Sequence, residues 1–254
     1  TFGYDSSKTG FSLGTTFEQY EDIFISPELS TYYESLSTND NASNALKQQE
    51  GTYIDTELRY SVIQDKRDQS FKPTEGYRAS FNQKLPLYSE SPSLINGIDY
   101  SAYHSFSDNF IGSLRFHGRA INSLSSSEDV KLSERLSIPG RYLRGFEVGK
   151  IGPVDASDYI GGNYVTALGF NAALPKLLPN LTNADVSLFL DTGNVWGIDY
   201  DTNIDESNKL RSAFGVSVDW FTPIGPLSFS FSEAITSAST DKPESFRFNI
   251  GTTF

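Results

Sequence analysis

The sequence contains no cysteine, no methionine and only two histidines. Without cysteine, the protein has no disulfide framework, no thiol nucleophile and no cysteine-ligated zinc or iron–sulfur site. Long hydrophobic runs are also lacking, because no segment approaches the roughly 20 apolar residues that a membrane-spanning helix needs. A natural translation product begins with methionine, so we expect that Thr1 follows a removed signal peptide or that the chain is a fragment of a longer protein.

Basic residues are scarce as well. The 20 Lys and Arg residues are outnumbered by 32 Asp and Glu residues, which gives a formal net charge of −12. A nucleic-acid binder needs a basic face, so this balance argues against a nucleic-acid partner, although the basic residues could still form a local patch. The mean hydropathy of −0.36 is typical of a soluble protein. A transmembrane β-barrel can share that average, since half of each strand faces a polar lumen.

Aromatic residues and period-two alternation are abundant. The chain holds 19 Phe, 14 Tyr and 2 Trp residues, which would suit the aromatic girdles of a membrane barrel. Leu227, Phe229 and Phe231 alternate with serines, as in a strand with one apolar face, whereas helical periodicity is weak. The alternation predicts about eleven strands, each near the ~10 residues that a tilted strand needs to cross a bilayer. They lie at roughly 10–19, 22–36, 52–65, 76–87, 96–107, 110–122, 162–174, 184–192, 209–221, 226–235 and 245–254.

The predicted connections alternate in length. Short ones, such as 65–75 and 222–225, alternate with long polar ones, such as 38–49, 124–163 and 193–208. Short turns on one side and long loops on the other are typical of outer-membrane barrels. A soluble sandwich has the same two-faced strands, so the pattern alone does not separate the two classes, but the regularity and the aromatic content favour the barrel.

The predicted fold is therefore an all-β, transmembrane, antiparallel up-and-down β-barrel. Bacterial barrels built from one chain have an even number of strands. An odd count indicates that the first strands of the barrel are absent from this chain.

The last segment, 244–254, carries the most specific pattern. Phe246, Phe248 and Ile250 alternate with polar residues, and Gly251 stands three residues before Phe254, the last residue. This arrangement resembles the β-signal of outer-membrane proteins, an edge strand that is read by strand addition during assembly. A plain final strand is the alternative interpretation.

Five further motifs occur in a fixed order. They are Asp65-Lys-Arg-Asp-Gln-Ser-Phe-Lys-Pro-Thr-Glu-Gly76, Leu143-Arg-Gly-Phe146, Ile160-Gly-Gly-Asn163, Leu190-Asp-Thr-Gly-Asn-Val-Trp196 and Trp220-Phe-Thr-Pro-Ile-Gly-Pro-Leu227. Together they resemble the bacterial surface antigen superfamily, whose members insert or translocate proteins at outer membranes. The resemblance covers residues 65–254, about three quarters of the chain.

The resemblance implies a barrel of sixteen strands preceded by periplasmic POTRA domains. Residues 1–254 would be the C-terminal portion of that one barrel domain, about eleven of its strands, with a long extracellular loop at about 123–161. The POTRA domains and the first strands would be absent. The implied location is the bacterial cell outer membrane.

The implied function is the folding and insertion of β-barrel proteins, as the core of the outer-membrane assembly machinery. Insertion would proceed through a lateral gate that involves the last strand. The expected partners are unfolded outer-membrane proteins, recognised by their C-terminal β-signal, outer-membrane lipids and periplasmic assembly lipoproteins. No bond is made or broken, so we expect no enzymatic activity, no cofactor and no metal.

The resemblance also implies a loop lock in the lumen, formed by Arg144, Gly145, Phe146 and Asp191. In the family, a carboxylate at the position of Asp191 binds the loop arginine. Physical reasoning agrees, because an arginine inside a barrel needs a carboxylate, and Asp191 ends a predicted strand on its polar face. A second acidic residue of the family aligns near Gly169, which is a departure from the pattern. A solvated loop arginine is the alternative.

Three other functions stay open. A secretion pore of the same superfamily would share all the motifs, but would pass a polypeptide through the lumen. A passive porin or receptor would leave the Arg-Gly-Phe loop unexplained. An outer-membrane hydrolase would need a nucleophile beside His104 or His117, and no residue pattern marks one.

Overall fold

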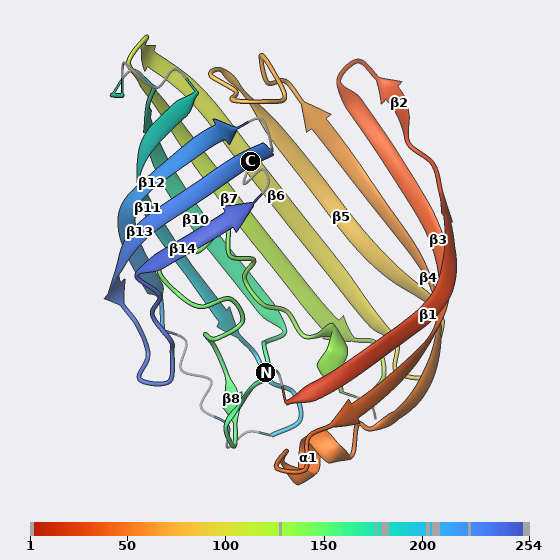
Figure 1. Ribbon diagram of the computed structural model, residues 1–254. Coiled ribbons are helices and arrows are strands. Elements are labelled where there is room, and N and C mark those ends of the chain that lie inside the picture. The colour runs from red at the N-terminus through yellow and green to blue at the C-terminus, as the bar shows by residue number, and fades with distance from the viewer. Residues whose placement is uncertain are drawn as a thin grey trace.

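The computed structural model describes residues 3–126, 129–175, 177–178, 183–201, 204, 209–222 and 225–250. Within these residues, eleven strands follow one another in a single curved antiparallel sheet (Figure 1). They are β1 (Tyr4–Gly14), β3 (Ile23–Thr38), β4 (Gly51–Asp65), β5 (Gly76–Ser89), β6 (Ser93–Ser107), β7 (Phe110–Ser123), β10 (Tyr164–Leu174), β11 (Ala184–Trp196), β12 (Arg211–Thr222), β13 (Gly225–Thr236) and β14 (Phe246–Ile250). The predicted all-β, antiparallel fold is confirmed.

The remaining elements are short. Strand β2 (Phe17–Tyr20) pairs with β3, and β8 (Val154–Asp155) pairs with β9 (Asp158–Tyr159) in a separate small hairpin. The helix α1 (Asn44–Lys47) has one turn and is capped by Ser43. A 3₁₀ turn covers Leu132–Glu134. No helix of the described residues has the length and apolar character needed to cross a membrane.

The first predicted strand, 10–19, has the wrong bounds. Strand β1 begins at Tyr4 and ends at Gly14, and a separate strand, β2, follows it. The start was missed because residues 5–8 are Asp, Ser, Ser and Lys, which show no apolar alternation. The pairing of β1 with β3 along its whole length holds them in the sheet instead. At the other end, Gly251 and Phe254 lie outside the described residues.

Each strand of the sheet pairs with the next one along the chain, and β1 and β14 form its two edges. No ladder joins β1 to β14 within the described part of the chain. The sheet curls so far that both edges approach the viewer in Figure 1, and the connection between β7 and β10 runs inside the curl.

The two faces of the sheet differ in polarity. The inner face carries charged and polar side chains that are buried, such as Glu34, Glu57 and Asp191, whereas large apolar side chains point outward and stay exposed. The exposed fraction of Phe214, for example, is 53%. A soluble sandwich would bury its apolar face. The observed order is that of a barrel in lipid, with an apolar outside and a polar lumen. The outward set includes Leu29, Tyr33, Ile54, Ile98, Phe170, Leu188, Leu190, Phe214, Val216, Trp220, Phe231, Phe246, Phe248 and Ile250.

The connections lie at two ends of the sheet. One end, the short-turn end, carries residues 66–75, 108–109, 175–183 and 223–224. The other, the long-loop end, carries 39–50, 124–163, 197–210 and 237–245, as well as a short turn at 90–92. The longest connection, 124–163, lies at the long-loop end as predicted, but connection lengths do not strictly alternate, because 90–92 is short and 237–245 is no longer than 66–75.

The connection 124–163, which we call the inner loop, lies on the concave side of the sheet. Its side chains Ile138, Leu143, Phe146 and Ile151 are buried in one cluster. The strands complete this cluster with Val165, Ala167, Val195 and Ala213. Small inward side chains on β10 and β12 therefore make room for the large apolar side chains of the loop.

The polarity of the outer face is testable at Leu188, which lies in β11 and is half exposed. In the intact protein folded into lipid vesicles, we expect Leu188→Arg to lower the free energy of unfolding by about 2–4 kcal/mol, because a cation would enter the bilayer. Leu188→Phe is the control and should change little. The measurement is urea unfolding monitored by tryptophan fluorescence, and equal stability of the two variants would contradict a lipid-facing position.

Candidate functional site

Arg144 of the inner loop and Asp191 of β11 form a bidentate ion pair. Nε of Arg144 donates to Oδ2 of Asp191 at 2.7 Å, and Nη2 donates to Oδ1 at 2.8 Å. The backbone N–H of Arg144 donates to the same Oδ2 at 3.0 Å. The Asp191 side chain is fully buried, with an exposed fraction of 0%. Three donors therefore satisfy one buried carboxylate, and the loop is fixed by both its side chain and its backbone.

Two further residues hold the guanidinium of Arg144. Nη2 also donates to Oδ1 of Asn171 in β10 at 2.8 Å. The guanidinium carbon lies 3.6 Å from the centre of the Phe189 ring, a cation–π contact. Asn171 and Phe189 face each other across the β10–β11 ladder. Sequence reasoning missed both residues, although Phe189 is two positions from Asp191 and therefore shares its face.

Gly145 and Phe146 pack the inner loop against the strands of the sheet. Gly145 has a φ of +90°, and a Cβ added there would lie 2.4 Å from Cβ of Ala213 in β12. Both the backbone conformation and the close approach therefore require glycine. Phe146 follows directly and is buried in the cluster of the inner loop, with an exposed fraction of 2%. The structure brings all four predicted lock residues together.

Gly169 explains how the lock works without the second acidic residue. It lies opposite Asp191 in the β10–β11 ladder. A Cβ added at Gly169 would lie only 2.8 Å from Oδ1 of Asp191. The glycine therefore leaves the space that the Asp191 carboxylate occupies, and Asp191 is the carboxylate that binds Arg144.

The same part of the loop contacts the last strand, which sequence reasoning did not predict. Nη1 of Arg247 in β14 donates to the carbonyl oxygen of Gly140 at 2.8 Å, and Nη2 donates to that of Phe146. Nε of Arg247 donates to Glu244 at 2.7 Å. The backbone N–H of Glu244 donates to the carbonyl oxygen of Gly145 at 2.9 Å. The lock and the last strand are thus one hydrogen-bonded unit.

The predicted gate residues lie on the outer side of β14. Phe246, Phe248 and Ile250 are exposed, Ile250 to 75%. The described pairing of β14 with β13 runs from Phe246 to Ile250 only. Phe246 and Phe248 each place a ring 5.0 Å, between centroids, from an outward ring of β13. The other predicted gate residues, Gly251 and Phe254, fall outside the described residues.

Buried ion pairs anchor the rest of the inner loop. Nζ of Lys131 lies 2.6 Å from Asp55 and 3.4 Å from Glu34, carboxylates of β4 and β3. Burial alone would lower the pKa of Lys131, but the carboxylates of Glu134, Asp55 and Glu34 raise it. The lysine is therefore charged and the anchor is an ion pair. All of these acidic groups except Glu134 lie on the strands that begin the sheet.

Two arginines anchor the neighbouring loops. Arg135 pairs with Asp199 of the loop 197–210. Burial opposes the charge of Asp199, yet Arg135 and the backbone N–H of Val130 keep its pKa below the usual value. Arg211, at the start of β12, donates to Asp241 at 2.9 and 3.1 Å, and both side chains are buried. Ion pairs thus connect the loops of the long-loop end to one another as well as to the strands.

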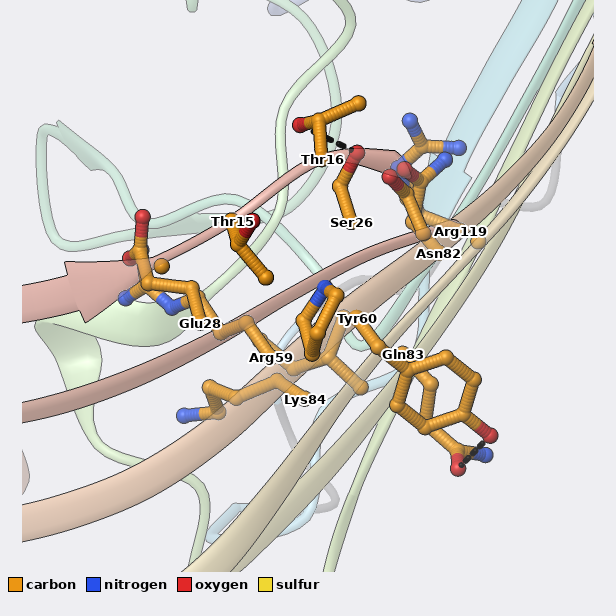
Figure 2. Close-up of a pocket in the computed structure, with 15 residues that line it drawn as sticks. Thr15, Thr16, Ser26, Glu28, Arg59, Tyr60, Asn82, Gln83, Lys84 and Arg119 are labelled. Carbon is orange, nitrogen blue, oxygen red and sulfur yellow. Dashed lines mark hydrogen bonds between the residues drawn. The ribbon is translucent and has the colours of Figure 1, made fainter. Parts of the chain in front are cut away.

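A cavity of about 660 Å³ lies away from the lock, on the β3–β7 part of the inner face (Figure 2). Its three basic side chains are each paired with an acid: Arg59 with Glu57, Lys84 with Glu134 and Arg119 with Asp99. Because each basic side chain of this cavity is already paired with an acid, the cavity offers no unpaired charge to a ligand.

The two histidines have structural partners. His117 bonds to Asp99, with 2.7 Å between Nδ1 and Oδ1, and its ring stacks on Tyr142 of the inner loop. His104 bonds to Glu75 at the exposed short-turn end. Both contacts tie strands or loops together, and neither histidine is bonded to a serine among the described residues.

The chain is similar to known proteins along its whole length. Residues 2–254 match the model of the Omp85 superfamily domain. The chain is 24% identical over 258 residues to the outer membrane protein assembly factor BamA of Neorickettsia risticii, which covers 99% of this chain and 34% of that protein. It is 26% identical over 226 residues to BamA of Neisseria meningitidis serogroup B, which covers 75% of this chain and 28% of that protein. The chain therefore spans about a third of the length of these relatives.

Solved structures show the same fold. The crystal structure of BamA from Haemophilus ducreyi lacking POTRA domains 1–3 superimposes with a TM-score of 0.85 at 23% identity, over 96% of this chain and 54% of that one. CdiB from Acinetobacter baumannii superimposes with a TM-score of 0.62 at 15% identity, over 97% of this chain and 42% of that one.

The lock predicts the behaviour of Arg144 variants. We expect Arg144→Ala to release the inner loop, because Asp191 would be left buried without its partner, at a cost of about 3–5 kcal/mol. Limited proteolysis of the intact protein should then cut within 124–163 faster than in the wild type. Arg144→Lys keeps the charge but not the two-pronged geometry, so its cleavage rate should be intermediate. Wild-type resistance in Arg144→Ala would contradict the lock.

Proposed function

The chain belongs to the Omp85 superfamily and is an outer-membrane β-barrel, and from that premise we propose that its protein folds and inserts β-barrel proteins into the bacterial outer membrane. The likeness to BamA assembly factors over up to 99% of the chain supports this function. The structural observation that carries the proposal is the joining of the lock to the last strand through Arg247.

The proposed mechanism is a lateral gate at β14. Among the described residues this strand is an edge of the sheet, and an edge presents unpaired backbone N–H and C=O groups. In lipid such groups must be satisfied, so an incoming strand gains stability by pairing there. The β-signal of an unfolded outer-membrane protein would be that strand. The outward side chains Phe246, Phe248 and Ile250 would hold the pairing site at the level of the lipid.

The inner loop would control the position of β14. Arg247 spans from the last strand to carbonyl oxygens on both sides of Arg144, at Gly140 and Phe146. Movement of β14 away from its place must either break these bonds or carry the loop with it. The lock at Asp191 resists the second course. The gate would therefore open by loss of the Arg247 contacts while the loop stays docked.

This mechanism needs neither a cofactor nor a chemical step, and we propose that the protein is not an enzyme. Pairing of strands and transfer of apolar side chains into lipid supply the free energy. The proposed partners are unfolded outer-membrane proteins, outer-membrane lipids and periplasmic assembly lipoproteins.

A secretion pore of the same superfamily is the alternative function. It requires an open path through the lumen for a polypeptide. The inner loop occupies the concave side of the sheet, held by Arg144–Asp191 and Lys131–Asp55 among its ion pairs. Passage would need these pairs to break, whereas lateral release at β14 leaves them intact. The geometry therefore favours insertion.

Reconstitution tests the function. The intact protein in lipid vesicles should speed the folding of an added, unfolded outer-membrane barrel protein, measured as protease-resistant product on a gel. Vesicles that carry an unrelated porin are the control. In cells, depletion should lower the assembly of many outer-membrane proteins. Loss of a single exported protein with normal barrel assembly would instead identify a secretion pore.

The Arg247 contacts give a separate prediction. We expect Arg247→Ala to lower the free energy of local opening of β14 by about 1–3 kcal/mol, because charge-assisted hydrogen bonds are lost. Amide hydrogen exchange in 246–250 measures this opening. Arg59→Ala is the matched control, since it removes a luminal arginine of β4, which is not a neighbour of β14 in the strand order. Unchanged exchange in Arg247→Ala, or an equal effect of Arg59→Ala, would show that Arg247 does not hold the strand.

A further inference from the structure

Arg115, on the inner face of β7, lacks partners for part of its guanidinium. Nε and Nη2 are buried, and neither has a hydrogen-bond partner among the described residues. An arginine stays charged in proteins, and a buried charge without a partner is costly. Buried polar groups in native proteins are almost always satisfied, so these two donors point to a ligand.

The residues directly opposite Arg115 in the two neighbouring strands carry no charge. Its register neighbours are Ser101 in β6 and Gly169 in β10. A Cβ added at Gly169 would lie 3.8 Å from Nη2 of Arg115 and 2.8 Å from Oδ1 of Asp191. Gly169 itself offers no carboxylate to the arginine, and the Asp191 carboxylate, which binds Arg144, occupies the space beside it.

Four carboxylates line or border the two cavities beside Arg115: Asp99, Asp185, Asp191 and Asp219. Asp191 accepts three hydrogen bonds from Arg144. Asp99 accepts from His117, Arg119 and Tyr142. Asp185 pairs with Lys72. Asp191 and Asp219 attract Arg115 through space, but among the described residues no acid accepts a hydrogen bond from its Nε or Nη2.

Two adjoining cavities meet at Arg115. They have volumes of about 330 and 460 Å³ and share Tyr103, Arg115 and Arg141. The smaller one is also lined by Arg67 and Arg78. Four arginines thus line the smaller cavity, where Asp99 is the one acidic side chain among the described lining residues.

The cavities have a fixed rim at the short-turn end. Arg67 belongs to the turn 66–75, and its Nε and Nη2 are held by the two carboxylate oxygens of Asp65 at 2.8 and 2.6 Å. Gln69, Lys72 and Thr74 of the same turn line the larger cavity. Arg141 reaches the cavities from the other side, from the inner loop.

We propose that these cavities form a binding site for an oxyanion, a phosphate or carboxylate group, that enters from the short-turn end. The planar guanidinium presents paired donors that match the oxygens of such a group. The low-dielectric walls of the lumen concentrate the field of the other arginines at the same place. The site is a property of the inner face and does not depend on the proposed insertion function.

An anion bound at this site would also contact the inner loop. Arg141 is three residues from Arg144, and both line the larger cavity. An anion shared by Arg115 and Arg141 would add one more link between the loop and β7. It would also screen the repulsion between the like charges of Arg115 and Arg144.

Calorimetry on the intact protein in neutral detergent, at constant ionic strength, tests the site. Sodium phosphate should bind saturably to the wild type, sodium chloride should not, and Arg115→Gln should weaken phosphate binding at least about tenfold. Arg141→Gln should weaken it less, because Arg141 is exposed. Arg59→Gln is the control, since it removes the same charge from the other luminal cavity and should leave binding unchanged.

A parallel titration with phosphatidylglycerol in mixed micelles separates the source of the oxyanion. If inorganic phosphate binds in an Arg115-dependent way, the ligand of the site is a free anion. If only the lipid binds in this way, the ligand is a lipid headgroup. Lack of Arg115-dependent binding of both, or an equal loss in Arg59→Gln, would overturn the proposal.

Stability without phosphate gives an independent readout. Because Arg115→Gln removes an unpaired buried charge, its urea midpoint should equal or exceed that of the wild type in phosphate-free buffer. Added phosphate should raise the midpoint of the wild type and not that of the variant. A variant that is less stable in both buffers by the same amount would show that Arg115 is satisfied within the protein, and would refute the site.

Discussion

The pairing of Arg144 with Asp191 is the constraint on which the interior of this barrel depends. The inner face of a barrel is largely polar, so the apolar cluster of the inner loop is supplemented by buried ion pairs. The structure uses a fully buried carboxylate with three donors from one loop residue. Around this point Phe146 and Leu143 find an apolar cluster, and Gly145 allows the loop to touch β12. The ion pair and the apolar contacts of the loop thus lie within four residues of one another, Leu143 to Phe146, and act on the same part of the loop.

Ion pairs of this kind are spread around the whole inner face. Lys131 reaches the strands at the beginning of the sheet, Arg135 reaches the loop 197–210, and Arg211 reaches the loop before the last strand. Breaking one such pair is costly because the remaining charge stays buried. The arrangement of side chains in the lumen is therefore constrained by these pairs, since each buried cation must lie beside an acid. Arg115 is an exception, because its buried Nε and Nη2 have no hydrogen-bond partner among the described residues. This exception is the reason to propose a ligand beside it.

Much of the fold could be predicted from the sequence because a strand in lipid has one simple requirement. The alternation that includes Phe229 and Phe231 fixed both the strand and its outer face, and the polar position of Asp191 fixed the inner one. The strand start at Tyr4 could not be found, since residues 5–8 are polar at every position. The contact of Arg247 could not be found either, because its acceptors at Gly140 and Phe146 are backbone oxygens, which leave no trace in the sequence. Lys131 needs the register of two strands before its two acids, Asp55 and Glu34, come together.

The inner loop also has a consequence for the order of folding. Its contacts join residues that are distant along the chain: Lys131 and Glu34 are 97 residues apart, and Arg247 and Gly140 are 107 apart. Contacts of such high sequence separation form late, because closing a long loop of chain costs entropy before the contact repays it. The full set of loop contacts therefore forms only after β3 and β14 are in place, whereas the Arg144–Asp191 pair needs β11 alone. The complete network around the inner loop therefore reports that strands far apart in the sequence have taken their places in one sheet.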